Sequence, residues 1–316
     1  MDPDQSIDEW VVAAGLDYEV QNRPAFFKDV DGLEVAIPQA KALVRSDTND
    51  TLAMVSRRYK VVQPREVLEF YRTLTENQGF ELETAGALAS GKRVWALARL
   101  GKSYVLPPND RIDGYLLLAT SYDGKFATTA QLTSVRVVCN NTLTWSLEGD
   151  QAAVVRVTHS QDFDPKSVKA DLGLLDEGWN GFTHQIKMLA DTPVSMRQAV
   201  TYFMELMGEE DEDPQFAVDN NYALRRLLQA YENAPGQQIA SARGTAWGLV
   251  NAVTYFADHA RRAHNNGSRV NSAWFGQSAT LKRKAFAAAM SIAMQGESAR
   301  EIARTEHSQM PAIGQA

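Results

Sequence analysis

The stretch Tyr115-Leu-Leu-Leu-Ala-Thr-Ser121, followed by Asp123-Gly124 and then by Phe126-Ala-Thr-Thr-Ala-Gln131, decides the fold. Two runs rich in apolar and β-branched residues flank an Asp-Gly pair. Tight hairpin turns favour this pair because their central positions need positive φ. The stretch therefore predicts an antiparallel hairpin in the N-terminal half of the chain.

Further strand and helix signals surround this hairpin. Short β-like runs occupy residues 51–56, 81–85 and 93–100. Between the first two runs, Pro64 suits the first turn of a helix and Gly79 suits its end. Residues 134–147 are compatible with either a helix or a strand, because apolar residues at helical spacing overlap a β-branched run.

After residue 163 the pattern becomes helical. Asp164-Pro165 is a favourable helix start. Apolar residues then follow in steps of four and three, which predicts one long helix, at Val168, Leu172, Leu175, Trp179, Phe182, Ile186 and Leu189. Thr192-Pro193 predicts the start of another helix, and further helices are expected over 222–231, over 249–260 and from Ser278.

These patterns predict an α+β protein with an antiparallel β-hairpin sheet in its N-terminal half and a predominantly helical C-terminal half. We divide the chain into an irregular N-terminal arm (1–50), a β-rich region (51–160), a helical region (161–304) and a frayed tail (305–316). Within the arm, Asp31-Gly32 is a turn signal.

Composition limits the class of protein. The chain has 316 residues, of which 44% are hydrophobic, enough to bury a core. No apolar run reaches about 18 residues, so no membrane partner is expected. The acidic N-terminus lacks a secretory pattern and the single cysteine, Cys139, has no internal disulfide partner, so we expect a cytoplasmic protein. The net charge of −7 argues against binding nucleic acid through bulk positive charge.

Catalytic motifs are missing from the sequence. Residues 86–91 lack the Gly-Lys-Ser/Thr ending of a phosphate-binding loop, and no Gly-x-Ser-x-Gly elbow is present. His259 and His264 are five residues apart, which places them on different faces of a helix. Cys139 follows two valines, a setting typical of an inert buried thiol. The acidic run 209–213 lacks the spacing of a calcium loop. We therefore predict no catalytic residue, no cofactor and no metal site.

One region departs from the acidic background. Between Ser241 and Lys284 the only acidic residue is Asp258, whereas the basic residues are Arg243, Arg261, Arg262, Arg269, Lys282, Arg283 and Lys284. Aromatic residues are interleaved with them: Trp247, Tyr255, Phe256, Trp274 and Phe275. Cations that neutralise phosphates beside rings that stack on bases are typical of single-strand binding. The alternative is that the aromatics are core residues and the cations a solvated helix face.

A second and weaker basic set lies in the β-rich region. It consists of Arg57, Arg58, Lys60, Arg65, Lys92 and Arg93. These residues are further candidates for phosphate contacts.

The segments 113–124 (Asp-Gly-Tyr-Leu-Leu-Leu-Ala-Thr-Ser-Tyr-Asp-Gly) and 134–143 (Ser-Val-Arg-Val-Val-Cys-Asn-Asn-Thr-Leu) resemble the phage/plasmid-like protein family. Downstream, the resemblance includes Thr245-Ala-Trp247, Asn251-Ala-Val-Thr254, Asp258-His259 and Trp274-Phe-Gly276 with Lys282. The family is a domain of unknown function associated with laterally transferred DNA. The resemblance implies a bacteriophage, prophage or plasmid context and supplies no catalytic residues.

Together, the basic region and the resemblance favour a non-enzymatic DNA-binding protein that holds or anneals single strands during recombination or replication. Phage annealing proteins of this kind work as rings or filaments, so a homo-oligomer is expected. Trp274 and Phe275 are the candidate stacking surfaces. The candidate phosphate contacts are Arg261, Arg262, Arg269, Lys282, Arg283 and Lys284, together with Arg57, Arg58, Lys60, Lys92 and Arg93. The alternative is a protein-interaction module that counters a host defence or assembles with another phage protein, using the acidic run 209–213.

Overall fold

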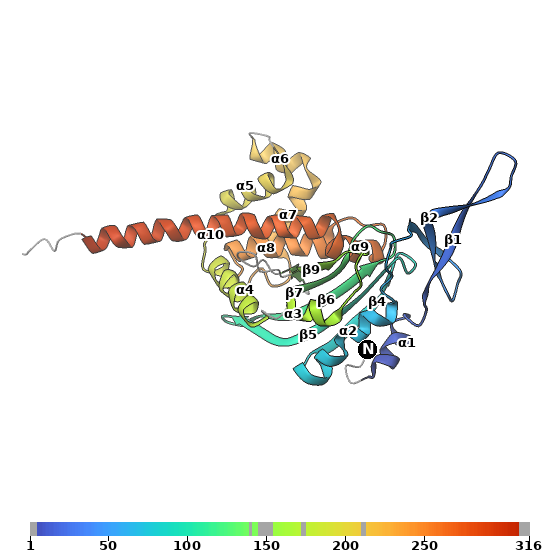
Figure 1. Ribbon diagram of the computed structural model, residues 1–316. Helices are drawn as coiled ribbons and strands as arrows, with labels where there is room; N and C mark the ends of the chain where they lie inside the picture. The colour runs from blue at the N-terminus through green and yellow to red at the C-terminus, as the bar shows by residue number, and fades with distance from the viewer. Residues whose placement is uncertain (1–4, 139–140, 145–153, 172–174, 210–212, 310–316) are drawn as a thin grey trace, which may run out of the picture.

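The computed structural model describes residues 5–138, 141–144, 154–171, 175–209 and 213–309. It shows a mixed α/β architecture, with antiparallel sheets in the N-terminal half and helices in the C-terminal part (Figure 1). The strands are β1 (Val20–Lys28), β2 (Glu34–Arg45), β3 (Thr51–Ser56), β4 (Glu81–Leu88), β5 (Arg93–Leu106), β6 (Asp110–Ser121), β7 (Thr128–Arg136), β8 (Asn141–Thr144) and β9 (Val154–Val157).

The helices begin with α1 (Ile7–Ala13) and α2 (Pro64–Gln78), and the others follow β9. These are α3 (Pro165–Asp171), α4 (Leu175–Ala190), α5 (Met196–Met207), α6 (Pro214–Asn220), α7 (Tyr222–Asn233), α8 (Ala246–Tyr255), the π-helical turn η1 (Phe256–Ala260), α9 (Asn266–Phe275) and α10 (Gln277–Gln309).

The larger sheet is built from the predicted hairpin. It has the strand order β4-β5-β6-β7-β8, and β9 pairs with β7. Strands β6 and β7 are antiparallel, with Tyr115 opposite Thr133 and Ala119 opposite Thr129, and Gly124 has a φ of +69° in the connection between them. This positive φ is the backbone state that the Asp-Gly signal anticipates. The ambiguous segment 134–147 forms strand where it is described, because Arg136 pairs with Asn141 and Thr133 with Thr144.

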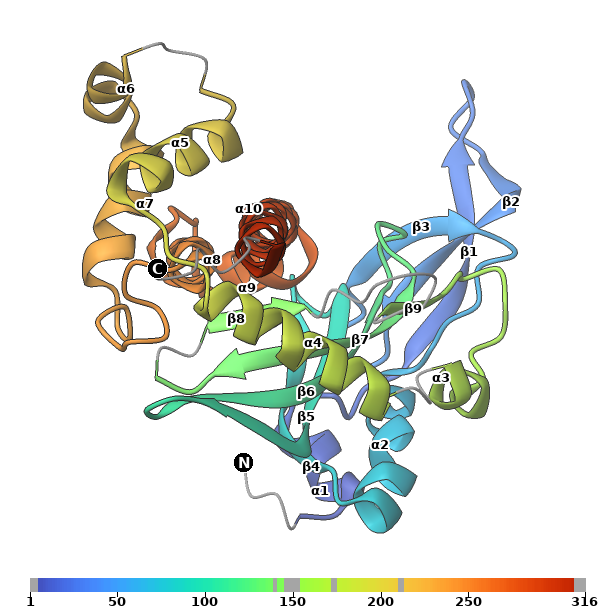
Figure 2. The same ribbon diagram turned by 90° about the vertical axis from the view of Figure 1, so that its left-hand side faces the viewer.

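Helix α2 packs on one face of this sheet (Figure 2). Pro64 occupies its first turn and Gly79 ends it with a φ of +68°, as the sequence predicts. The hydroxyl of the buried Tyr71 donates to the carbonyl oxygens of Ala96 (2.9 Å) and Leu116 (3.0 Å), which ties the helix to β5 and β6. Helices α4, α8, α9 and α10 of the C-terminal part also contact this sheet.

A buried ion pair joins the larger sheet to the helical part. The Asp110 carboxylate accepts hydrogen bonds from Arg136 Nε (2.6 Å) and Nη2 (2.7 Å), both within the sheet. It also accepts from Ser241 Oγ (2.6 Å) and from the indole N–H of Trp247 (3.2 Å) in the helical part. Arg136 Nη2 donates in addition to the Gly236 carbonyl. This network fixes the start of α8 against the sheet.

The segment 1–50 differs from the expected irregular arm. It contains α1, capped by Ser6 and Glu9, and the long hairpin β1–β2, which forms a separate small sheet with β3. The turn signal Asp31-Gly32 is confirmed, because Gly32 has a φ of +81° between paired Lys28 and Glu34. The tip of this hairpin projects away from the rest of the molecule (Figures 1 and 2).

Three helical boundaries also differ from the prediction. In place of one helix over 165–189, α3 and α4 flank residues 172–174, which lie outside the described part. Helix α5 begins at Met196 and not at Thr192-Pro193, because Ser195 caps it and Pro193 forms a bridge with Thr245. Helix α10 continues to Gln309, beyond the expected end at residue 304. None of the described helices has both the length and the apolarity needed to cross a membrane.

Candidate functional site

Two arginines of the 241–284 region, Arg261 and Arg262, follow a helix whose hydrogen-bond pattern changes from α to π. Helix α8 passes into η1, and the Arg261 N–H donates to the Phe256 carbonyl, five residues back, at 2.7 Å. Arg261 itself is extended, with φ −65° and ψ 137°. Single π-helical turns often accompany functional sites because they redirect the residues that follow. Here the redirected residues are Arg261 and Arg262.

Arg261, Arg262 and Arg269 line one hollow of about 160 Å³, which we call the cationic hollow. Its remaining lining residues come from η1, the loop after η1, α9 and the first turn of α10: Ala257, Ala263, Ser272, Gln277 and Ser278. No carboxylate is among these lining residues. Three arginines that the sequence places within nine positions are therefore brought together on one concave surface.

The three guanidinium groups have neutral partners. Arg261 donates to Ser278 Oγ (3.2 Å) and Gln277 Oε1 (3.1 Å), and Arg269 donates to the carbonyl oxygens of His259 and Arg261. Arg262 lies over the ring of Tyr222, 4.6 Å from its centroid. In the described part of the chain, none of the three forms an ion pair with a carboxylate. Their charge is left for an external anion.

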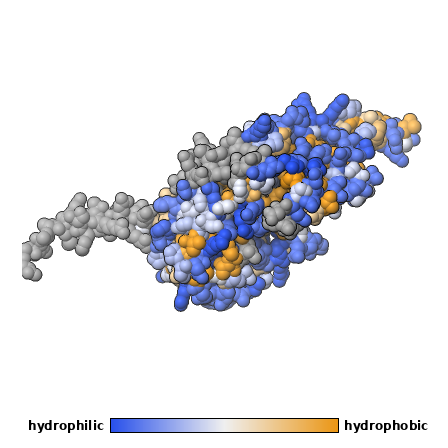
Figure 3. Space-filling view, turned by 90° about the horizontal axis from the view of Figure 1, so that it is seen from below, coloured by the Kyte–Doolittle hydropathy of each residue, from blue (hydrophilic) through white to orange (hydrophobic). Residues whose placement is uncertain are grey.

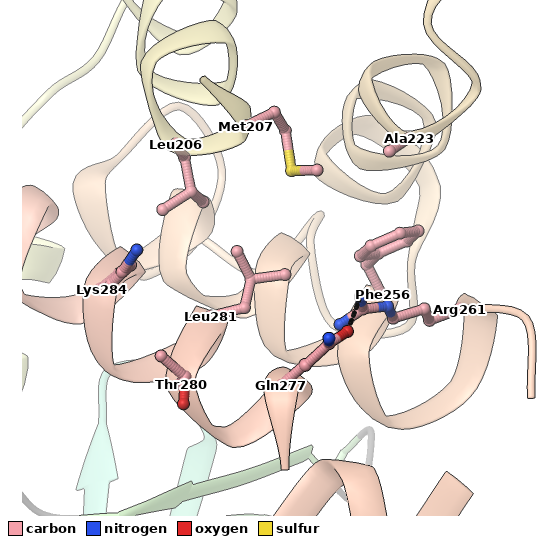
Figure 4. Close-up of a pocket in the computed structure, with 9 residues that line it drawn as sticks. All are labelled: Leu206, Met207, Ala223, Phe256, Arg261, Gln277, Thr280, Leu281 and Lys284. Carbon is pink, nitrogen blue, oxygen red and sulfur yellow. Dashed lines mark hydrogen bonds between the residues drawn. The ribbon is translucent and has the colours of Figure 1, made fainter. Parts of the chain in front are cut away.

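A larger hollow of about 440 Å³ adjoins the cationic hollow and shares Arg261 and Gln277 with it (Figure 4). We call it the apolar pocket. Leu206, Met207, Ala223, Phe256 and Leu281 of α5, α7, η1 and α10 point into it, and Thr280 and Lys284 complete its rim (Figure 4). Its surface is therefore apolar inside and cationic at two places, Arg261 and Lys284.

Lys282 belongs to neither hollow. Its side chain is buried, and its ammonium donates to Asp258 Oδ1 and Thr142 Oγ1, both at 2.7 Å. The other oxygen of Asp258 accepts from the N–H (2.8 Å) and hydroxyl (3.0 Å) of Thr142. This corrects the expectation that Lys282 contacts phosphate, because a buried, paired ammonium is not presented to a ligand. The only acid of the basic region is thereby neutralised inside the protein.

Trp274 and Phe275 pack against the larger sheet. Trp274 meets Trp95 edge-on at 4.9 Å between ring centroids, and Phe275 stacks on Phe126 at 5.0 Å. Both contact the small buried cluster of Leu97, Tyr115 and Leu117. Their faces are used in holding α9 on the sheet, so we leave them out of the candidate site. The exposed ring beside the arginines is Tyr222, which is separated from them in sequence and which sequence reasoning missed.

The other predicted cations are dispersed. Arg57 and Arg58 are exposed after β3, and Lys60 pairs with Asp162. Arg93 is nearly buried between Asp123 and Asn271, and Lys92 is half-buried beside it. Arg283 is exposed on α10, where it donates to Thr280. The structure does not gather the second basic set into a hollow with the first.

The remaining sequence candidates add no site. Cys139 and most of the acidic run 209–213 lie outside the described residues. Among the residues that are described, no group of three or more His, Cys, Asp or Glu side chains has the geometry to hold a metal ion.

The fold and this surface define a mixed α/β protein in which three arginines, without carboxylate partners among the described residues, line one concave surface. The sequence profile of the family described as "Domain of unknown function (DUF932)" matches residues 51–274, well over half of the chain. The chain therefore belongs to this family. The match includes the cationic hollow's three arginines and leaves out the hairpin β1–β2 and the whole of α10. No curated protein matches the chain significantly, and no solved structure does.

Proposed function

We propose that this protein is a non-enzymatic, cytoplasmic DNA-binding protein of a phage, prophage or plasmid, which holds or anneals single strands through the cationic hollow. The observation that carries the proposal is the set of three guanidinium groups, Arg261, Arg262 and Arg269, that line one hollow and lack carboxylate partners in the described part of the chain. Phosphate groups are the natural ligands of such a cluster, because guanidinium donors match their oxygens in geometry and charge.

Tyr222 supports the single-stranded form of the ligand. The residue is 42% exposed, and the Arg262 guanidinium lies over its ring. An unpaired base stacks on such a ring, whereas a base inside a duplex is already stacked on its neighbours. Replacing Tyr222 by Ala is therefore expected to weaken binding of a single strand more than binding of a duplex.

The test is fluorescence anisotropy of labelled single- and double-stranded oligonucleotides across a salt series. Three neutralised phosphates give a slope of log K against log salt of about −2 for a single strand. Charge reversal of Arg261 and Arg262 to Glu removes two of the three contacts and is expected to reduce the affinity and flatten the slope by roughly two thirds.

The matched control is the double reversal of Arg156 and Lys166 to Glu. Both are exposed and lie away from the hollow, on β9 and α3, and the net charge changes by the same amount. Equal affinities of the two double variants would show that the hollow is not the binding site. Binding to neither oligonucleotide at low salt would reject the proposal and leave the protein-interaction module as the working hypothesis.

A further inference from the structure

The projecting part of the hairpin β1–β2 exposes large apolar side chains on both of its faces. Phe26 and Phe27 are each 51% exposed, and because they are consecutive in a strand they point to opposite faces. Val30 and Leu33, at the turn, are more exposed still, and Val35 adds to the patch. Figure 3 shows apolar surface at the end of the molecule where the hairpin projects in Figure 1. Clusters of this kind mark an interaction surface.

Among the described residues, no third strand pairs with this part of the ribbon. Strand β3 pairs with β2 only over Ala40–Val44, so the pairs from Phe26–Ala36 to Lys28–Glu34 belong to two strands alone. A free two-stranded ribbon is marginally stable in water. Packing of its apolar residues on a further surface would remove this instability.

The charge of the hairpin tip limits the kind of surface on which the tip can pack. Residues 24–36 carry Asp29, Asp31 and Glu34 against the single cation Lys28. Three carboxylates oppose the phosphates of a nucleic acid and the anionic headgroups of a membrane. The complementary surface is therefore apolar with cations at its rim.

The apolar pocket has this character. Leu206, Met207, Phe256 and Leu281 form its interior, and Arg261 and Lys284 are the charged residues of its lining (Figure 4). The hairpin tip is remote from α5, α7 and α10 of its own chain in both ribbon views, so it does not reach the pocket within one molecule (Figures 1 and 2). We infer that the β1–β2 hairpin tip of one copy docks in the apolar pocket of a second copy.

This contact joins two different surfaces and is therefore head-to-tail, which builds a ring or a filament and not a closed two-fold dimer. In such an assembly the cationic hollow of each copy lies next to a docked hairpin and recurs from copy to copy. The inference does not rest on the proposed function, because the assembly is measured without any nucleic acid.

The first experiment is light scattering coupled to size-exclusion chromatography on the full chain. The wild type is expected to be oligomeric at tens of micromolar, and the double variant Phe26→Ser, Phe27→Ser to be monomeric with an unchanged circular dichroism spectrum, since both rings lie outside the core. The control is Val105→Ser, which removes an equally exposed side chain from β5. A monomeric wild type, or a double variant that assembles like the control, overturns the inference.

Two further variants test the docking site itself. Lys284→Glu is expected to weaken assembly by placing a carboxylate against the acidic tip, and adding Glu34→Lys is expected to restore it. In a Cys139→Ser background, a Val30→Cys protein mixed with a Thr280→Cys protein is expected to form a disulfide-linked heterodimer. An oligomer that shows neither charge rescue nor this cross-link uses a different interface, and the hairpin-to-pocket contact is then rejected.

Discussion

The Asp110→Asn variant tests whether the buried ion pair holds the sheet and the helical part together. Asp110 is fully buried and accepts four hydrogen bonds, two from Arg136 and one each from Ser241 and Trp247. Asparagine preserves the shape, but it leaves the guanidinium, itself 2% exposed, without its counter-charge and turns one acceptor into a donor.

Removing one partner of a buried pair costs about 3–5 kcal/mol, because the other charge stays buried and uncompensated. For a domain of this size, each kcal/mol lowers the melting temperature by roughly 2–4 °C. We therefore expect Asp110→Asn to lower the melting temperature by roughly 10 °C and to shift the urea midpoint in the same direction.

The control for this prediction is Asp162→Asn, the same chemical change in the exposed pair with Lys60. Exposed pairs contribute little, so this variant should unfold like the wild type. The reasoning is refuted if Asp110→Asn unfolds at the same temperature and urea concentration as Asp162→Asn.

Three further outcomes are expected. Gly248→Ala should lower the free energy of unfolding in urea by about 1–3 kcal/mol, because its Cβ would lie 2.1 Å from the Ala242 carbonyl oxygen; a tolerated substitution would contradict this close packing. Burial lowers the pKa of His159 below its usual 6.5, so the unfolded chain binds the proton more readily and the folded state loses stability as pH drops below about 6.5. His159→Gln should therefore reduce the dependence of the melting temperature on pH between pH 7.5 and 5.5. A pH dependence equal to that of the wild type would refute this. Lys282→Met should destabilise the fold by about 3 kcal/mol, since Asp258 stays buried, yet leave oligonucleotide anisotropy unchanged; a loss of affinity in the folded variant would return Lys282 to the binding site.

Local sequence signals predicted the elements whose stability is local. Asp123-Gly124 predicted the central hairpin, and Pro64 with Gly79 predicted both ends of α2. These residues are informative because each favours the particular backbone φ that a turn or a helix end needs. The hairpin β1–β2 was missed for the opposite reason. Its exposed tip has apolar residues on both faces, so the alternation that identifies a half-buried strand is absent.

The candidate site was predicted only in part. The charge distribution pointed to Arg261, Arg262 and Arg269, and the structure places them in one hollow. The pairing of Lys282 with Asp258 could not be seen, because the residues are 24 positions apart on different elements. Interleaved aromatics likewise do not reveal which side of a helix faces the core, and Trp274 lies on the sheet side.

The cationic hollow belongs to a protein whose net charge is −7. The electrostatic potential is therefore positive at the hollow and negative over much of the remaining surface. At low ionic strength, a polyanion approaching from most directions meets repulsion from the rest of the surface. At physiological salt the Debye length is about 8 Å, so the distant carboxylates are screened and the local arginines dominate at short range. For the proposed DNA ligand, we therefore expect capture to depend on the direction of approach, and we expect its rate to fall less steeply with salt than for a uniformly basic protein.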